Sequence, residues 1–461
     1  MKNLYSDSLH RSLLARTLKM AIAILVVTLA GVIVTSVATA QPADAPRSAK
    51  AHVIVQFGDH NLAARAINFT APISGLRALE LTGLPIVTAT SAWGTSVCSI
   101  GGVGCPASDC FCGGSTFWGY KYWDGSAWQD YMVGADSSSV NDGAVEGWRW
   151  GPWGSAMQPA RPVTSAVQAL DWLAPRQSLT DGGYGGDSAT AEAQLAVAAN
   201  NYTAAEWRRQ SDAPSLLSYQ MMYASRFASQ GAGASGKLAV AQIGARTPCW
   251  TNNTRQPSHY YNSGTGAYSN EAGPHAWAML GTVALSQTVS AQAVQYLKNL
   301  QQPNGGWEWS PGWGTDTNTT ALAVQALVAT GESITSTIVT NGLAYLKSAQ
   351  NNDGGFPYDP TSPWGTASDA NSTAYVIQAI LAAGQDPTSV AWKKNGNDPY
   401  TFLLSLQLSD GSFEWQRGTG SNQLATVQSI VALLGRPFPL RVASVNACPV
   451  LYFPFISRQT P

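Results

Sequence analysis

The chain has 461 residues, of which 45% are apolar and only 11% charged, and its formal net charge is −1. Soluble domains carry about 25% charged residues, so Ser, Thr, Asn, Gln and Gly must supply most of the polar surface. A nearly neutral chain lacks the basic stripe expected of a nucleic-acid-binding protein, which excludes nucleic acid as a partner. The length suffices for two domains, or for one large and one small domain.

The first 40 residues have the pattern of an export segment. Four basic residues precede an uncharged run over residues 20–40, which ends in the small residues Ala38-Thr39-Ala40. The run, at about 20 residues, is also long enough to remain as an uncleaved membrane anchor. Both alternatives stay open. Both predict that the rest of the chain lies outside the cytoplasm, either extracellular or at the cell surface.

A small β domain is expected before the helical part of the chain. Residues 41–84 are interpreted as a linker with a first strand, since residues 52–58 alternate loosely between apolar and polar side chains. Residues 85–155 are rich in Gly, Ser, Trp and Tyr. Within them, residues 117–123 and 128–133 flank an Asp-Gly turn, which predicts a β-hairpin. The sequence therefore predicts a β domain over residues 85–155.

Six cysteines follow the export segment, and an even number in an oxidising compartment predicts disulfides. They are Cys98, Cys105, Cys110, Cys112, Cys249 and Cys448. The first four could instead be proposed as a metal site. However, C-x-C differs from the C-x2-C spacing of structural zinc, and no histidine lies nearby. The pairing stays open, although Cys249 and Cys448 could join the tail of residues 438–461 to the main body.

From about residue 163 the chain changes to Ala-rich segments with helical periodicity and an internal repeat. Its best copy, Gln-Asn-Asn-Asp-Gly-Gly-Phe, occupies residues 350–356, and related copies end at Trp307, Phe413 and Tyr184. Each unit reads as helix, glycine turn, aromatic residue, loop and second helix. About six such hairpins over residues 163–437 would close into an α/α toroid. The predicted fold is therefore mainly α, with a small disulfide-containing β domain before the toroid.

These glycine-turn units resemble the repeats of squalene cyclases and protein prenyltransferases. Residues 316–321, Asp-Thr-Asn-Thr-Thr-Ala, also have the outline of the D-x-D-D-T-A box of squalene-hopene cyclases. The resemblance implies that the middle residue of the box would protonate an alkene. That residue is Asn318 here, and Asn371 occupies the same place in the next repeat. An amide cannot be a Brønsted acid, so the sequence favours a protein without enzymatic activity and with no catalytic residue.

The sequence also argues against prenyl transfer, because that reaction needs a zinc ion held by carboxylate, thiolate and imidazole groups. The helical part contains Cys249, His259 and His275, but no Asp/Cys pair at ligand spacing. We therefore expect no metal site, and we interpret His275 as a packed polar residue.

The segment from Trp118 to Trp150 resembles the small β domain of the intrinsic factor and transcobalamin family. This resemblance implies an exported binding protein that holds a bulky small molecule between toroid and β domain. A corrinoid such as cobalamin is the implied ligand, and no cofactor is required. A membrane uptake system could receive the ligand.

The candidate ligand-binding residues share a polar or aromatic side chain near a predicted turn or domain surface. They are Asp316, Asn318, Asp369, Asn371, Trp309, Trp313, Tyr358, Trp364, Trp118, Tyr120 and Trp123. The alternative for Asn318 and Asn371, as for Thr319 and Ser372, is that they cap the helices that follow.

Two alternative functions remain open. One is a terpene cyclase-like enzyme whose acid lies at another position, because residue 318 is an asparagine. The other is a carbohydrate-active or carbohydrate-binding protein, because Glu308 and Glu414 occupy equivalent places and a glycosidase needs paired carboxylates.

Overall fold

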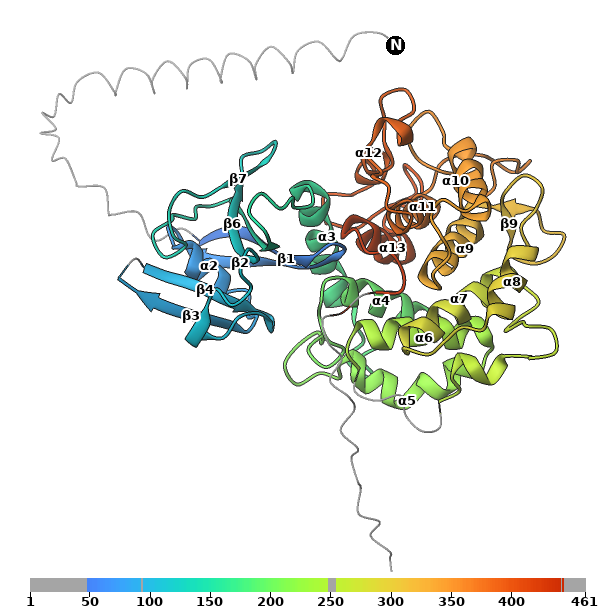
Figure 1. The fold of residues 1–461 in the computed structure, drawn as a ribbon, viewed down its shortest axis with the longest axis horizontal. Helices are drawn as coiled ribbons and strands as arrows, with labels where there is room; N and C mark the ends of the chain where they lie inside the picture. The colour runs from blue at the N-terminus through green and yellow to red at the C-terminus, as the bar shows by residue number, and fades with distance from the viewer. Residues whose placement is uncertain (1–47, 93, 248–253, 441, 443–461) are drawn as a thin grey trace, which may run out of the picture. The chain divides into compact units, whose positions relative to one another are not determined.

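A computed structural model describes residues 48–92, 94–247, 254–440 and 442 (Figure 1). These described residues belong to one compact unit. The expected export segment, Cys249, Cys448 and most of the tail lie outside the described residues. Within the described ranges, no helix combines the length and the hydrophobicity needed to cross a membrane.

The β region contains a five-stranded sheet in the order β2-β1-β8-β6-β7. Its strands are β1 (Ser48–Gly58), β2 (Asn61–Thr70), β6 (Phe117–Trp123), β7 (Trp128–Asp130) and β8 (Val145–Gly151). Only β1 and β8 pair in parallel. The predicted hairpin is therefore present as β6 and β7. The first strand expected over residues 52–58 is β1, and it belongs with β2 to the same sheet as the hairpin, so the β region begins at Ser48.

A smaller sheet and a short helix complete the β region. They are β3 (Ile86–Ser91), β4 (Gly94–Ile100), β5 (Val103–Gly104) and α2 (Gly75–Glu80). The prediction of disulfides is confirmed for four cysteines, which pair as Cys98–Cys110 and Cys105–Cys112. Their sulfur atoms therefore serve as covalent cross-links and not as metal ligands.

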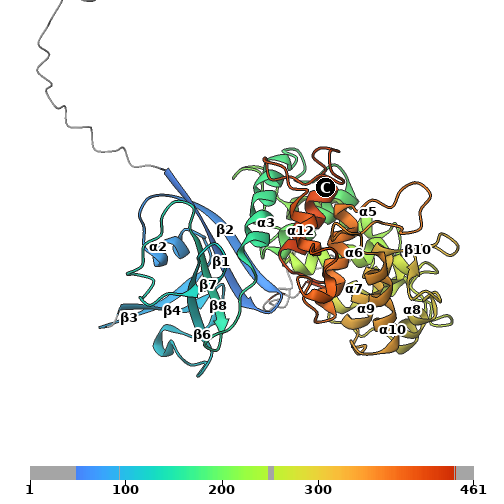
Figure 2. The same cartoon turned by 90° about the horizontal axis from the view of Figure 1, so that it is seen from above.

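Alternate side chains of β1 pack into two different cores, as expected for a strand. Val53 and Val55 pack with Trp118 in the core of the β region. Ile54 belongs instead to the large core of the helical region, together with Leu62 of β2. The long β1–β2 hairpin lies beside α3 (Ala160–Leu173), as Figure 2 shows. This hairpin therefore fixes the β region to the helices through buried apolar contacts.

Helices alternate between an inner and an outer layer around a ring. The inner helices are α4 (Asp187–Ala199), α6 (Ala232–Gly244), α7 (Ala272–Ala284), α9 (Thr317–Ala329), α11 (Ala370–Ala382) and α13 (Gln423–Leu433). Each inner helix contacts the next, and α13 contacts α4, which closes the ring (Figure 1). The outer elements are α3, α5 (Leu216–Ala228), η3 (Pro257–Tyr260), α8 (Ala291–Asn299), α10 (Thr337–Ala349) and α12 (Pro399–Leu404).

The repeated Gln-Gly motif joins neighbouring hairpins of this ring. Gln350 Nε2 donates to the carbonyl of Gly354 in its own turn and to the carbonyl of Trp392 in the next hairpin. Gly354 has φ +87, and a Cβ there would lie 2.6 Å from a carbonyl oxygen, so glycine is required. In the last hairpin, the equivalent Gln407 donates to the carbonyl of Ser165 in α3. The motif therefore joins the last hairpin to the first helix.

The inner helices all end at one mouth of the ring, where the chain after α13 covers the opening. The Phe438 amide donates to Gln325 Oε1, and Gln378 Nε2 donates to the Arg436 carbonyl. The Phe438 ring lies 5.2 Å from that of Trp277. We call this end, closed by residues 434–440, the C-terminal mouth.

The β1–β2 hairpin also meets the ring at the C-terminal mouth. Asn61 Oδ1, beside its turn, accepts hydrogen bonds from Arg436 and from Asn201. The side chain of Asn200, the C-cap of α4, bonds to both backbone groups of Ala64 in β2. The β region is therefore attached at the ends of the inner helices, away from their starts.

Candidate functional site

A cavity of about 500 Å³ lies inside the ring at the starts of the inner helices. All six inner helices contribute to it, and two loops contribute Trp309 and Tyr358. The helical residues are Ser188, Ala189, Glu192, Lys237, Trp277, Asn318, Leu322, Asn371, Tyr375, Leu424 and Gln428. We call this space the central cavity and its opening the N-terminal mouth.

Apolar and aromatic side chains form most of the wall of the central cavity. Trp277 and Tyr375 are 3% and 8% exposed and lie on different helices of the ring. Leu322 adds an aliphatic surface from α9, and Trp309 adds another indole. Binding sites for small organic molecules are mainly apolar with a few convergent polar groups, and this cavity has that character.

One ion pair supplies the only charged side chains in the described lining. Lys237 Nζ lies 2.5 Å from Glu192 Oε1, and the two side chains are 17% and 7% exposed. Lys237 Nζ also lies 4.9 Å from the centroid of Trp277. Neither residue of this pair is among those predicted from the sequence. A signal existed, because Glu192 lies in the buried part of Ala-rich α4, and Lys237 is the one charged residue of α6.

The two asparagines of the cyclase-like boxes both line the central cavity. Asn318 and Asn371 are the second residues of α9 and α11, so neither caps its helix. Asn371 Nδ2 donates to Gln428 Oε1 at 2.6 Å. The capping interpretation is therefore wrong for these asparagines, because the caps lie two residues earlier.

The N-caps of α9 and α11 are Asp316 and Asp369, which lie behind the cavity wall and are each 2% exposed. Asp316 Oδ1 accepts from the Thr319 amide at 2.7 Å. Its Oδ2 is buried and accepts no hydrogen bond of ordinary geometry from a described residue. Burial raises the pKa of Asp316 to about 6, although its hydrogen bonds and the nearby Tyr358 hydroxyl oppose this shift.

Asp369 occupies the same position but is more completely hydrogen-bonded. Its Oδ1 accepts from the Ser372 amide, and its Oδ2 accepts from the Ser372 hydroxyl at 2.7 Å. Burial raises the pKa of Asp369, and these hydrogen bonds oppose the shift. Both carboxyls therefore support the helix starts, and Asp316 is the less satisfied of the two.

The remaining predicted aromatic residues lie elsewhere. Trp313 and Trp364 are 72% and 95% exposed on loops, outside the cavity lining. Trp118 is in the core of the β region, and its Nε1 donates to the Val103 carbonyl. Tyr120 donates to Glu146, and Trp123 packs edge-on against Trp128. Since the β region is attached near the C-terminal mouth, its aromatic residues do not close over the central cavity.

Glu308 and Glu414 both hold loops in place. Glu308 Oε2 accepts from the Gly312 amide, and the two oxygens of Glu414 accept from the Gly418 and Gly420 amides. These backbone bonds lower the pKa of Glu414, which keeps it ionised. Glu414 is therefore poorly suited to be the proton donor of a glycosidase.

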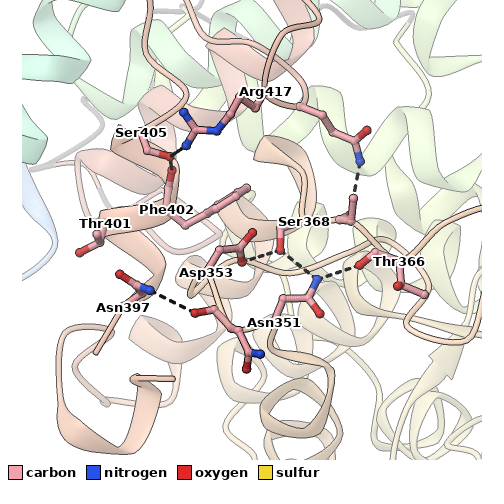
Figure 3. Close-up of a pocket in the computed structure, with 12 residues that line it drawn as sticks. Asn351, Asp353, Thr366, Ser368, Asn397, Thr401, Phe402, Ser405 and Arg417 are labelled. Carbon is pink, nitrogen blue, oxygen red and sulfur yellow. Dashed lines mark hydrogen bonds between the residues drawn. The ribbon is translucent and has the colours of Figure 1, made fainter. Parts of the chain in front are cut away.

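A larger groove, of about 960 Å³, lies among the loops near α12 (Figure 3). Its polar side chains are bonded mainly to one another and to nearby backbone. Asn351 donates to Ser368, Ser368 donates to Asp353, and Arg417 donates to Ser405. These bonds occupy part of the hydrogen-bonding capacity of the lining, and none of the predicted ligand-binding residues lies in this groove.

The described residues contain no group of three potential metal ligands. His275 is fully buried, its Nδ1 accepts from the Tyr268 amide, and its Nε2 lies 3.0 Å from the Ala293 carbonyl. Burial lowers the pKa of His275 to about 4, so the ring is neutral and joins α7 to α8. His275 is therefore a packed polar residue.

Comparison with protein families gives one match. Residues 268–430 match the squalene-hopene cyclase C-terminal domain. The matched segment carries α7, α9 and α11, and with them both asparagines of the cavity. No curated protein matches the chain.

Similar solved structures include the type II terpene cyclase MstE from Scytonema, without ligand, at 14% identity and a TM-score of 0.43. That comparison covers 60% of this chain and 98% of the cyclase. A protein from Actinoplanes has 14% identity and a TM-score of 0.41, with 59% and 98% of the two chains covered. A structure described as a glycosidase has 10% identity and a TM-score of 0.39, with 60% and 98% covered.

Proposed function

We propose that the helical ring is a squalene cyclase-type domain that takes a hydrophobic, isoprenoid-type small molecule into its central cavity. The observation that carries this proposal is the wall of Trp277, Tyr375, Leu322 and Trp309 within one cavity of about 500 Å³. Such a wall favours an apolar chain over a sugar or a peptide. The family match over residues 268–430 supports the same class of ligand.

The polar groups of the cavity would orient the ligand. The Glu192–Lys237 pair and the two amides provide acceptors and donors within an otherwise apolar wall. An isoprenoid alcohol or acid could place its oxygenated end there and its chain against the aromatic rings. The ion pair is therefore proposed to distinguish an amphiphilic ligand from a plain hydrocarbon.

Proton-initiated cyclisation through the usual acid is not part of this proposal, because Asn318 faces the cavity where the family would have a carboxyl. Asp316 supports a second candidate function. It is a buried carboxyl with a pKa raised to about 6 by burial, and Tyr358, which lines the cavity, lies beside it. A protonated Asp316 could pass its proton to the Tyr358 oxygen while the Tyr358 proton moves to an alkene carbon. The products would be an Asp316 carboxylate and a carbocation.

The central cavity does not suit the corrinoid that the resemblance of the β domain implied. The cavity volume of about 500 Å³ is typical of a pocket for a drug-sized molecule, and a corrinoid is far bulkier. The β region, which was expected to cover the ligand, is attached near the other mouth.

The test is retention of farnesol or geranylgeraniol by the purified protein through gel filtration, followed by mass spectrometry of the extracted ligand. We expect the wild-type protein to retain one of these alcohols. Leu322→Trp, which fills the cavity, should abolish retention. Ala367→Trp, in the groove of Figure 3, is the matched control and should retain the ligand.

The chromatographic retention time and fragmentation pattern of the extracted molecule separate the two candidate functions, because cyclisation that ends with loss of a proton leaves the mass unchanged. An unchanged alcohol indicates binding alone. A cyclised product that disappears in Asp316→Asn would favour the proton transfer through Tyr358. If folded wild-type protein retains neither alcohol, or if Leu322→Trp retains as much as the control, the proposal of a hydrophobic ligand in the central cavity is wrong.

A further inference from the structure

A second cavity, of about 490 Å³, lies where β2 meets the loops that follow α4 and α6. Its lining includes Arg65, Arg208 and Arg246, together with Tyr202 and Glu206. We call it the arginine pocket. It shares no lining residue with the central cavity, and no residue of the predicted ligand-binding set belongs to it.

The arginine pocket contains more positive than negative charge. None of its three arginines forms an ion pair with any residue in the described ranges. Its one carboxyl, Glu206, accepts from the Thr203 amide through Oε2. Arg65 is only 9% exposed. A buried cation without a counter-ion is costly, so the pocket lacks a negative charge that would compensate for it.

Contacts within the protein use only part of the hydrogen-bonding capacity of these arginines. Arg65 Nη1 donates to the carbonyls of Ala64 and Asn200. Arg246 Nη2 donates to Asn201 Oδ1, while its Nε is buried and has no hydrogen-bond partner among the described residues. Each guanidinium has five N–H donors, so donors remain for a ligand.

The ends of two inner helices offer a partial explanation for these charges. Arg65 bonds to the carbonyl of Asn200 at the end of α4, and Arg246 follows the end of α6. A helix C-terminus carries roughly half a negative charge. Two such ends therefore balance about one of the arginines, and Glu206 balances another. A net positive charge remains.

We infer that the arginine pocket binds an organic oxyanion, namely a carboxylate or phosphate group on a small apolar body. Guanidinium groups match the two oxygens of either group and bind them bidentately. Tyr202, already 3.6 Å below the Arg65 guanidinium, provides an aromatic surface, and Phe57 and Trp207 extend it. This inference does not depend on the ligand of the central cavity.

The experiment is calorimetric titration of the purified protein with phenyl phosphate and with benzoate, and benzyl alcohol serves as the neutral probe. We expect saturable binding of at least one anion, weakened by added salt, and no binding of the alcohol. Arg246→Gln should weaken binding about tenfold or more, because it removes a charge-assisted hydrogen bond. Arg77→Gln changes an exposed arginine outside the pocket and should leave binding unchanged.

Arg65→Gln should weaken anion binding as strongly as Arg246→Gln does. If Arg65→Gln does not fold, the result for Arg246→Gln alone tests the inference. Absence of binding by both anions would overturn the inference, and so would equal weakening by Arg246→Gln and Arg77→Gln. The stronger of the two probes identifies phosphate or carboxylate as the preferred group. Inorganic phosphate that binds as tightly as phenyl phosphate would overturn the apolar body as part of the inference.

Discussion

The two mouths of the ring are made from the same six helices, yet they use polar side chains in different ways. At the C-terminal mouth, Gln325 and Gln378 are bonded to the backbone of residues 434–440 and are shielded from solvent. At the N-terminal mouth, Asn318 and the Glu192–Lys237 pair face a cavity. The first arrangement stabilises the fold, whereas the second leaves polar groups available to a ligand.

This difference follows from what covers each opening. The chain after α13 places Phe438 against Trp277, so the C-terminal mouth is filled by protein. The loops at the N-terminal mouth contribute Trp309 and Tyr358 to the wall but leave a space of about 500 Å³. Substitutions at the closed mouth should therefore change stability, and substitutions at the open mouth should change binding.

The largest expected effect is at the closed mouth. Phe438→Ala removes a ring that is 5% exposed, and large-to-small changes of this kind cost about 3–5 kcal/mol. Urea unfolding monitored by tryptophan fluorescence measures the loss. Phe111→Ala, at a residue that is 62% exposed, is the matched control and should change the free energy of unfolding little. Equal stability of the two variants would show that residues 434–440 do not close the ring.

The second effect concerns the carboxyl behind the open mouth and depends on pH. The folded-state pKa of Asp316 is raised from 3.8 to about 6. The Asp316 carboxyl therefore binds its proton more tightly in the folded state than in the unfolded state. The stability that this protonation contributes is present below about pH 4 and is lost as pH rises from about 4 to 6. The difference between these pKa values corresponds to roughly 3 kcal/mol.

Asp316→Asn keeps the cap, because Asn caps helices as well as Asp does, and it removes the buried charge. We expect this variant to be more stable than the wild type at pH 7, by up to about 3 kcal/mol, and equally stable near pH 4. Unfolding curves at both pH values measure this. Asp369→Asn is the comparison and should gain less, since Ser372 already donates to both oxygens of Asp369. A loss of stability at pH 7 in Asp316→Asn would contradict the raised pKa.

The third effect is at the ion pair in the cavity. Glu192→Gln leaves the Lys237 ammonium without a counter-ion, which we expect to cost about 1–3 kcal/mol because the side chains still face the cavity. The double variant Glu192→Gln with Lys237→Met removes both charges and should recover most of that loss. A double variant no more stable than the single one would show that the pair does not act as a unit.

The smallest effect on stability is expected for the amides of the open mouth. Asn318→Ala and Asn371→Ala remove side chains that cap no helix, so each should change stability by less than about 1 kcal/mol. Both should weaken retention of an isoprenoid alcohol by about tenfold. Gel filtration with mass spectrometry measures retention. Unchanged retention in both variants would exclude these amides from the binding site.

The sequence predicts the helical hairpins well because their determinants are local. The turn glycines and their glutamines lie within a few residues of one another, so a repeat such as residues 350–356 is visible without any structure. The strands that pair with β1 could not be predicted from such local patterns. Its parallel neighbour β8 begins at Val145, far along the chain, and no local signal connects the two strands.

The candidate site was predicted in part, for physical reasons that differ between residues. Asn318 and Asn371 were placed near the cavity because their boxes precede inner helices. The sequence places the caps at the asparagines, two residues too late, since Asp, Asn and Thr are all favoured N-caps and occur together in both boxes. Lys237 was missed because its hairpin lacks the regular glycine motif. Glu192 follows the copy that ends at Tyr184, but no local signal connects it with Lys237, its partner 45 residues along the chain.

The hydrogen bond from Gln407 to Ser165 gives the helical region a circular order in which no hairpin is terminal. In an open array of repeats, the end units can be removed one at a time and the remainder still folds. A closed circle does not permit this, because deletion of any hairpin leaves two interfaces unmatched. Circular permutation differs from deletion, because it cuts the chain in an exposed loop and joins the original ends, which keeps every interface between hairpins. This ring should therefore accept circular permutation more readily than truncation.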